Sequence, residues 1–242
     1  MKEIGIPRIF ADTSKIPEIE AMNKTSLIYG ITSNPLIVAS EAKNSNDPDP
    51  IKYYEKLARQ FPDLPVSIQL LNNPGQNDVT GLMEQAKKYA SISPNVVIKV
   101  PFFGDGRETA IIARLVKENI KVNVTALMNS EQALLALMAG NQSNAKGPDY
   151  LSLFFNRIKD GGGNPRKEIR LTRLLLNLTG SDSQIIAGSI RQGSDIYEAS
   201  ISGAHITTVT PKIFWKTLFH QKSDEFIQQS QKAWEEYLAN TK

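Results

Sequence analysis

The chain has 242 residues, a formal net charge of +3 at pH 7, 40% hydrophobic and 22% charged residues, and no cysteine. The small net charge and the lack of a basic stripe interleaved with aromatic residues argue against nucleic-acid binding, and the lack of cysteine excludes disulfides and thiolate metal sites. With only His205 and His220 available, a zinc cluster is not expected. No apolar stretch approaches the length of a membrane span, so we expect no membrane partner and a cytoplasmic location.

Strand and helix patterns alternate along the whole chain. Short runs rich in β-branched residues predict strands at 9–13, 27–31, 65–70, 95–100, 121–125, 150–155, 184–189 and 205–209. Helical patterns follow them at about 15–22, 51–60, 77–89, 104–117, 130–138 and 194–201. A further helix follows the glycines at 161–163 and ends near 178, another begins at 211, and a last amphipathic helix is expected at about 224–238.

Eight such strand–helix units predict a (β/α)8 TIM barrel, an α/β fold, as a single domain over residues 1–242 with an extra C-terminal helix. An open, doubly wound sheet is the alternative. It is less favoured because no Gly-x-Gly-x-x-Gly follows the first strand.

A lysine lies inside the fourth predicted strand. Lys99 follows three consecutive apolar β-branched residues and stands two residues before Pro101. Lysine is rarely buried without a partner, and desolvation lowers its pKa, which frees the amine to attack a carbonyl. Lys99 is therefore a Schiff-base candidate. The alternative is a lysine that extends from an edge strand to water.

Other predicted strands also end in polar side chains, which is where TIM barrels carry their chemistry. Strand alternation places Asn123 and Thr125 on one face of the fifth strand. The polar residues at or near the predicted strand ends are Asp12, Thr32, Asn34, Gln69, Lys99, Asn123, Thr125, Ser152, Ser189, His205 and Thr207. This pattern favours a Schiff-base site over a plain core, and we assign no role to the last two.

Six short segments, in order between residues 9 and 211, resemble the transaldolases and the related fructose 6-phosphate aldolases. They are Phe-Ala-Asp-Thr at 10–13, Gly-Ile-Thr-Ser-Asn-Pro at 30–35, Val-Ile-Lys-Val-Pro at 97–101, Asn-Val-Thr at 123–125, Asn-Arg-Ile at 156–158 and Gly-Ser-Ile-Arg at 188–191. The resemblance implies that Lys99 forms a Schiff base with a ketose phosphate and that Asp12 assists proton movement during carbon–carbon cleavage.

The same resemblance implies roles for the other residues of the site. Thr125 would position a catalytic water, and Arg157, Ser189 and Arg191 would bind the terminal phosphate. The side chains implied to hold the dihydroxyacetone unit are Asn34, Asn123 and Ser152, and we count Thr32 and Phe154 as further candidates for substrate binding. No metal and no cofactor is implied.

Each assignment has a structural alternative. Asp12 could cap the first helix, Arg157 could be an exposed loop residue, and Asn123 and Thr125 could only satisfy polar groups of the barrel. Two arginines after neighbouring strands nevertheless suit recognition of a tetrahedral anion.

Two positions depart from the family pattern in opposite directions. Gln69 stands where transaldolases typically carry a glutamate, as in the aldolases, and Phe154 stands where the aldolases carry a tyrosine, as in transaldolases. Neither side chain exchanges a proton near neutral pH. We therefore expect a water held by Gln69 and Thr125 to relay the proton, with Asp12 as the nearby carboxylate.

The sequence predicts transfer of a dihydroxyacetone unit from a ketose phosphate, or a similar anionic ketose, to an aldose acceptor. One alternative is a lyase that releases dihydroxyacetone, and another is a non-catalytic barrel that binds sugar phosphates, in which Lys99 only contacts the ligand. The amphipathic C-terminal helix could cover its own barrel or dock on a neighbouring chain. Related small enzymes form oligomers through such helices, so the resemblance implies a homo-oligomer.

Overall fold

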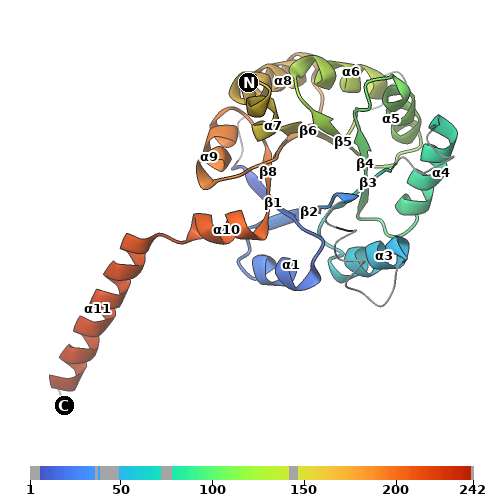
Figure 1. Ribbon diagram of the computed structural model, residues 1–242. Helices are drawn as coiled ribbons and strands as arrows, with labels where there is room; N and C mark the ends of the chain where they lie inside the picture. The colour runs from blue at the N-terminus through green and yellow to red at the C-terminus, as the bar shows by residue number, and fades with distance from the viewer. Residues whose placement is uncertain (1–5, 36–37, 39–48, 72–77, 142–146, 241–242) are drawn as a thin grey trace.

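Eight parallel strands close into a barrel in sequence order, and helices surround it (Figure 1). The computed structural model describes residues 6–35, 38, 49–71, 78–141 and 147–240. The strands are β1 (Arg8–Asp12), β2 (Ile28–Thr32), β3 (Val66–Gln69), β4 (Val96–Pro101), β5 (Val122–Leu127), β6 (Tyr150–Phe154), β7 (Gln184–Gly188) and β8 (Ile206–Val209). The predicted (β/α)8 fold is confirmed, and the open sheet is excluded.

The helices follow the strands as the sequence pattern requires. They are α1 (Ile16–Asn23), α3 (Pro50–Gln60), α4 (Val79–Ala90), α5 (Arg107–Lys117), α6 (Ser130–Asn141), α7 (Phe155–Asp160), α8 (Pro165–Thr179), α9 (Gly193–Ile201), α10 (Pro211–Leu218) and α11 (Gln221–Asn240). Local chemistry sets several of their starts: the carboxylates of Asp49 and Asp78 accept backbone N–H groups of α3 and α4, and the amide oxygen of Asn164 does the same for α8.

Two differences from the prediction concern residues at the ends of the barrel. β6 ends at Phe154, and Phe155 begins α7, a short helix that we did not expect. His205 precedes β8, so it lies at the amino end of the barrel and not at the end where we had placed it. The predicted start of the third helix at residue 77 falls outside the described residues.

The barrel interior has an apolar floor. Phe10, Ile186 and Ile206 form a buried cluster that Tyr150 covers, and these residues point inward from β1, β7, β8 and β6. Gly30 on β2 leaves the space that the ring of Phe10 occupies. The alternate, outward residues of the strands belong to the main core between barrel and helices.

Inward positions closer to the carboxyl ends of the strands are polar. Asp12 lies two residues beyond Phe10, and Thr208 lies two residues beyond Ile206, so each shares the inward face of its strand. Lys99 and Asn123 are paired in the register of β4 and β5, and Lys99 and Gln69 in that of β3 and β4. The register therefore brings three predicted site residues to one level.

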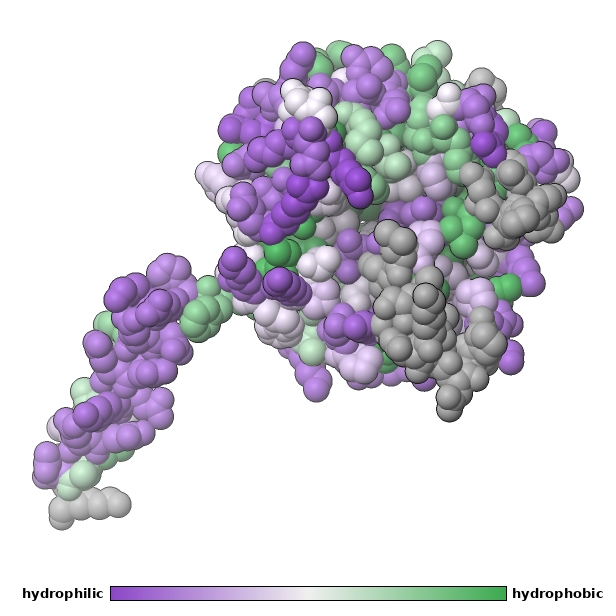
Figure 2. Space-filling model, in the orientation of Figure 1, coloured by the Kyte–Doolittle hydropathy of each residue, from purple (hydrophilic) through white to green (hydrophobic). Residues whose placement is uncertain are grey.

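The C-terminal helix projects away from the barrel. Figure 1 shows α11 separated from the surrounding helices, and Figure 2 shows hydrophobic residues scattered along its mostly hydrophilic surface. None of its residues is buried, and Phe226, Trp234 and Tyr237 are each more than half exposed. Among the helices of the described residues, none is long and apolar enough to cross a membrane.

Candidate active site

Lys99 is buried inside the mouth of the barrel. Its residue is 5% exposed, and its Nζ donates a hydrogen bond to the backbone oxygen of Ser33 at 3.1 Å. Burial lowers the pKa of the amine, and the carboxylate of Asp12 opposes that shift. The side chain therefore does not extend to water from an edge strand, which was one of the alternatives for Lys99.

Asp12 points to the same interior from β1. Thr32 Oγ1 donates to Asp12 Oδ1 at 3.1 Å, and a short hydrogen bond joins the hydroxyls of Thr32 and Thr208. Burial raises the pKa of Asp12, while the charge of Lys99 and the hydrogen bond from Thr32 lower it. Asp12 is not the N-cap of α1, because that position is Lys15. The amine and the carboxylate thus act on each other electrostatically inside the barrel.

A chain of hydrogen bonds crosses the interior on the side of β3, β5 and β6. Ser152 Oγ donates to Asn123 Oδ1 at 2.8 Å, and Asn123 Nδ2 donates to Ser67 Oγ at 3.1 Å. All three residues are buried. This chain fixes the orientation of the Asn123 amide, so its remaining N–H and the oxygen lone pairs have defined directions.

Three further predicted residues line the same region. Thr125 lies two residues beyond Asn123 on the inward face of β5, and its buried Oγ1 has no hydrogen-bond partner among the described residues. A buried hydroxyl in that state suits a water or a substrate oxygen. Gln69 is the last residue of β3, and Asn34 follows β2 directly after Ser33.

Phe154 closes β6 on the inward face, and its ring lies next to Gly188 of β7, whose added Cβ would be 3.4 Å from it. The aromatic ring forms part of the wall and supplies no proton. This side chain therefore contributes shape to the site.

The predicted anion-binding residues come from α7 and from the segment after β7. Arg157 and Arg191 are both exposed. Ser189 has the unusual backbone angle φ of 58°, and its carbonyl accepts a hydrogen bond from Asn156 Nδ2 at 2.7 Å. A serine in this left-handed conformation is strained unless its surroundings hold it, and Asn156 supplies such a contact.

Arg191 has a carboxylate partner that the sequence analysis missed. Its Nη1 donates to Asp160 Oδ1 at 2.8 Å and its Nη2 donates to Asp160 Oδ2, which forms a two-pronged ion pair. The side chains are 53% and 51% exposed. Hydrogen bonding to Arg191 lowers the pKa of Asp160. Residue spacing alone does not reveal this pair, because Asp160 precedes β7 in the sequence and Arg191 follows it.

A buried aspartate organises the segment that carries Arg191. Asp195 Oδ2 accepts hydrogen bonds from the backbone N–H groups of Arg191 and Gln192 and from Asn156 Nδ2. Burial raises the pKa of Asp195, and these hydrogen bonds outweigh that effect so that the net shift is downward. Its position as the third residue of α9, after Gln192, is the capping signal by which the sequence could have identified it.

Sequence analysis also missed Ser67, Ser33 and Thr208. Ser67 could have been found by strand alternation, since it lies two residues before Gln69. At β8 we considered Thr207, but the inward residue is Thr208, and Thr207 lies on the opposite face. Ser33 contributes a backbone carbonyl, which no side-chain pattern predicts.

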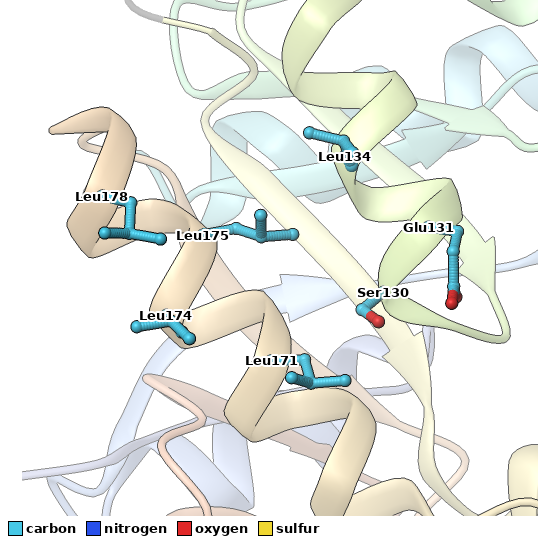
Figure 3. Close-up of a pocket in the computed structure, with 7 residues that line it drawn as sticks. All are labelled: Ser130, Glu131, Leu134, Leu171, Leu174, Leu175 and Leu178. Carbon is cyan, nitrogen blue, oxygen red and sulfur yellow. The ribbon is translucent and has the colours of Figure 1, made fainter.

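An apolar pocket of about 210 Å³ lies outside the barrel, between α6 and α8. Figure 3 shows Leu134 of α6 opposite four leucines of α8. The pocket holds none of the residues described above. Within the part of the chain that the structure describes, no group of three histidine, aspartate or glutamate side chains is arranged to hold a metal ion.

Comparisons of the sequence with known proteins identify the family of this chain. The chain matches the family model described as Transaldolase/Fructose-6-phosphate aldolase over residues 9–241. It is 31% identical to a probable transaldolase of Geobacillus sp. (strain WCH70) over 227 residues, which cover 94% of this chain and 98% of that protein. A probable transaldolase of Heliobacterium modesticaldum is 32% identical over 228 residues, with 94% and 97% covered. One from Streptococcus agalactiae serotype V is 31% identical over 235 residues, with 95% and 98% covered. This chain therefore belongs to the transaldolase/fructose-6-phosphate aldolase family.

Proposed function

We propose that this protein transfers a dihydroxyacetone unit from a ketose phosphate, or a similar anionic ketose, to an aldose acceptor through an imine on Lys99. The observation that carries the proposal is the buried Lys99 amine, whose ammonium form is disfavoured by burial, in a barrel mouth that also holds Asp12. A buried amine of this kind is the nucleophile that imine formation needs.

In the proposed reaction, Lys99 Nζ attacks the C2 carbonyl, and loss of water gives the imine. The C4 hydroxyl then gives its proton to the Asp12 carboxylate, the C3–C4 bond breaks, and its electron pair moves into the protonated imine. An aldose phosphate leaves and a three-carbon enamine remains. The enamine attacks the acceptor aldehyde, Asp12 returns the proton to the new hydroxyl, and hydrolysis of the imine restores the free amine.

Hydrogen-bonding groups around the amine suit the three-carbon unit. Asn123, oriented by Ser67 and Ser152, would hold a hydroxyl of the dihydroxyacetone unit, and Thr32 and Asn34 would hold others. The unpartnered hydroxyl of Thr125 and the amide of Gln69 would position the water that is released and later consumed. These groups select a polyhydroxylated ketone.

Two arginines and a serine would bind the anionic end of the substrate. Arg157 and Arg191 supply guanidinium groups, which suit a tetrahedral oxyanion, and Ser189 adds a hydroxyl. A phosphate or a sulfonate fits these donors, and both are anions of the proposed substrate class.

Transfer is favoured over release because Phe154 has no proton with which to quench the enamine. The alternative lyase would protonate the enamine and release dihydroxyacetone, for which a water on Gln69 would have to be the proton source. The non-catalytic alternative keeps only anion binding by the arginines.

Borohydride trapping tests the proposal. The protein is incubated with fructose 6-phosphate, reduced, and weighed intact by mass spectrometry. We expect a three- or six-carbon adduct that is absent in Lys99→Arg, whereas a wild-type protein without adduct would leave only the binding alternative. The Asp12→Asn variant should still form the imine but lose nearly all carbon–carbon cleavage; unchanged turnover in it would remove Asp12 from the mechanism.

A second assay separates transfer from release. With an acceptor such as glyceraldehyde 3-phosphate or erythrose 4-phosphate, a transferase forms a new ketose phosphate and little free dihydroxyacetone. A lyase releases dihydroxyacetone at a rate that the acceptor does not increase.

We also propose that the protein acts as a homo-oligomer, with each chain forming one cytoplasmic barrel domain over residues 1–242. The apolar side chains of α11, which include Phe226 and Trp234, are exposed, and a lone helix is only marginally stable in water. Packing against a second copy of the chain would bury them. Light scattering should show an oligomer for the full chain and a smaller species for a variant that lacks the residues after His220. A monomeric full chain would contradict the proposal.

A further inference from the structure

One hydroxyl that the proposed reaction does not use is linked to the Asp12 carboxylate through a second hydroxyl. Thr208 of β8 is 7% exposed, points into the barrel, and shares a short hydrogen bond with Thr32. Thr32 is 1% exposed and in turn donates to Asp12 Oδ1. Three side chains from β8, β2 and β1 thus form one continuous chain of hydrogen bonds.

Counting protons fixes the direction of this chain. A threonine hydroxyl carries one proton and two lone pairs. Thr32 gives its proton to Asp12, so the proton in the Thr32–Thr208 hydrogen bond belongs to Thr208. The donation therefore runs from Thr208 to Thr32 and from Thr32 to Asp12.

We infer that Thr208 is a positioning residue for Asp12, because its donation to Thr32 holds the Thr32 proton on the Asp12 carboxylate. While Thr208 donates its proton to Thr32, rotation of the Thr32 hydroxyl toward β8 would bring the Thr32 proton into repulsive contact with the Thr208 proton. A donor that also accepts a hydrogen bond is polarised and donates more strongly. Thr208 thereby stabilises the carboxylate form of Asp12, which is the form that accepts a proton in the proposed reaction.

Other groups around Asp12 do not replace this effect. Lys99 on β4 is the charged group that acts on Asp12, and β2 and β8 present only hydroxyls to it. At the rim, Glu18 of α1 is engaged by Thr13 and Lys15. The catalytic part of the inference rests on the proposed function, but the hydrogen-bond chain and its effect on Asp12 do not.

The chain offers a matched control in the neighbouring residue. Thr207 is also buried, but it lies on the opposite face of β8, and its hydroxyl has no partner among the described residues. Thr208→Val and Thr207→Val remove the same group from adjacent positions. Thr208→Ser keeps the hydroxyl and serves as the conservative variant.

The experiment follows the titration of Asp12 by carboxyl carbon-13 NMR, with Asp12→Asn to assign the signal, and does not depend on activity. We expect Thr208→Val to raise the midpoint by about half a pK unit and Thr32→Val to raise it by about one unit or more. Thr208→Ser and Thr207→Val should titrate like the wild type. If Thr208→Val does not fold, Thr208→Ala makes the same test.

An unchanged or lowered midpoint in Thr208→Val, or an equal rise in Thr207→Val, overturns the inference. Where the enzyme is active, the acid limb of the rate profile should move in parallel with the NMR midpoint. If the wild type and every variant fail to cleave ketose phosphates, the proposed function is wrong. The order of the Asp12 titration midpoints among the variants still decides the role of Thr208.

Discussion

Replacing Gly30 with alanine tests the packing that supports Asp12. A Cβ at this position would lie 2.5 to 2.7 Å from Cζ, Cε2 and Cε1 of Phe10. Carbon atoms pack at about 3.5 to 4.0 Å, so the ring has to move by about 1 Å. Phe10 is two residues before Asp12 on the same strand face, and it shares the floor of the barrel with Ile186 and Ile206.

Overpacking of this kind costs about 1 to 3 kcal/mol. We expect Gly30→Ala to lower the free energy of unfolding by about 2 kcal/mol, which corresponds to a melting temperature about 4 to 8 °C lower in a chain of this size. Phe10→Ala removes the ring. In that background Gly30→Ala should be neutral or stabilise by about 0.5 kcal/mol, because alanine restricts the unfolded chain more than glycine does.

Urea unfolding of the wild type, both single variants and the double variant measures this coupling. Gly188→Ala is the matched control, because its Cβ would be no closer than 3.4 Å to Phe154 and the strand should tolerate it. Equal losses from Gly30→Ala with and without Phe10 would refute the reasoning, since the clash would then not be with the ring.

Three further predictions concern the site. Imine trapping should increase as the pH rises through the pKa of Lys99, which burial places below 10.5. In Asp12→Asn this rise should occur at lower pH because the opposing charge is gone; a rise at higher pH would contradict the coupling. Asn123→Ala leaves two buried hydroxyls without their partner and should destabilise the protein by about 2 to 3 kcal/mol in urea unfolding, whereas a loss below about 0.5 kcal/mol would contradict the hydrogen-bond chain. Asp160→Ala should raise the KM for an anionic donor up to about fivefold through loss of Arg191 orientation, with kcat little changed. An equal effect on an uncharged ketose donor would show that Asp160 does not act through the anion.

The sequence predicts the barrel and its inward residues where a local rule suffices. Alternating strand and helix patterns give eight units, and strand alternation puts Asn123 and Thr125 on one face. Lys99 was identifiable because a charged residue interrupts a run of β-branched residues. These inferences need only period and composition, so they do not depend on how the strands are arranged.

Contacts between strands could not be predicted in the same way. The pair of Asp160 with Arg191 depends on how α7 and the segment after β7 meet, and the pair of Thr32 with Thr208 depends on barrel closure beside β1. The start of α7 at Phe155 was missed because the pair Phe154–Phe155 is as typical of the end of a strand as of the start of a helix. Register and closure are properties of the whole chain, which a local pattern does not contain.

The apolar floor supports the chemistry that we propose at this level of the barrel. A strand rises by about 3.3 Å per residue, so Asp12 lies about 6 to 7 Å beyond Phe10 along β1, towards the carboxyl end of the barrel. The apolar floor and the surrounding strands bury Lys99 and partly bury Asp12, which strengthens their mutual attraction and raises the cost of charge on each. Burial raises the pKa of Asp12 and lowers the pKa of Lys99, which narrows the difference between the two. A more polar floor would weaken the desolvation that shifts both pKa values, and it would favour the ammonium form of the amine.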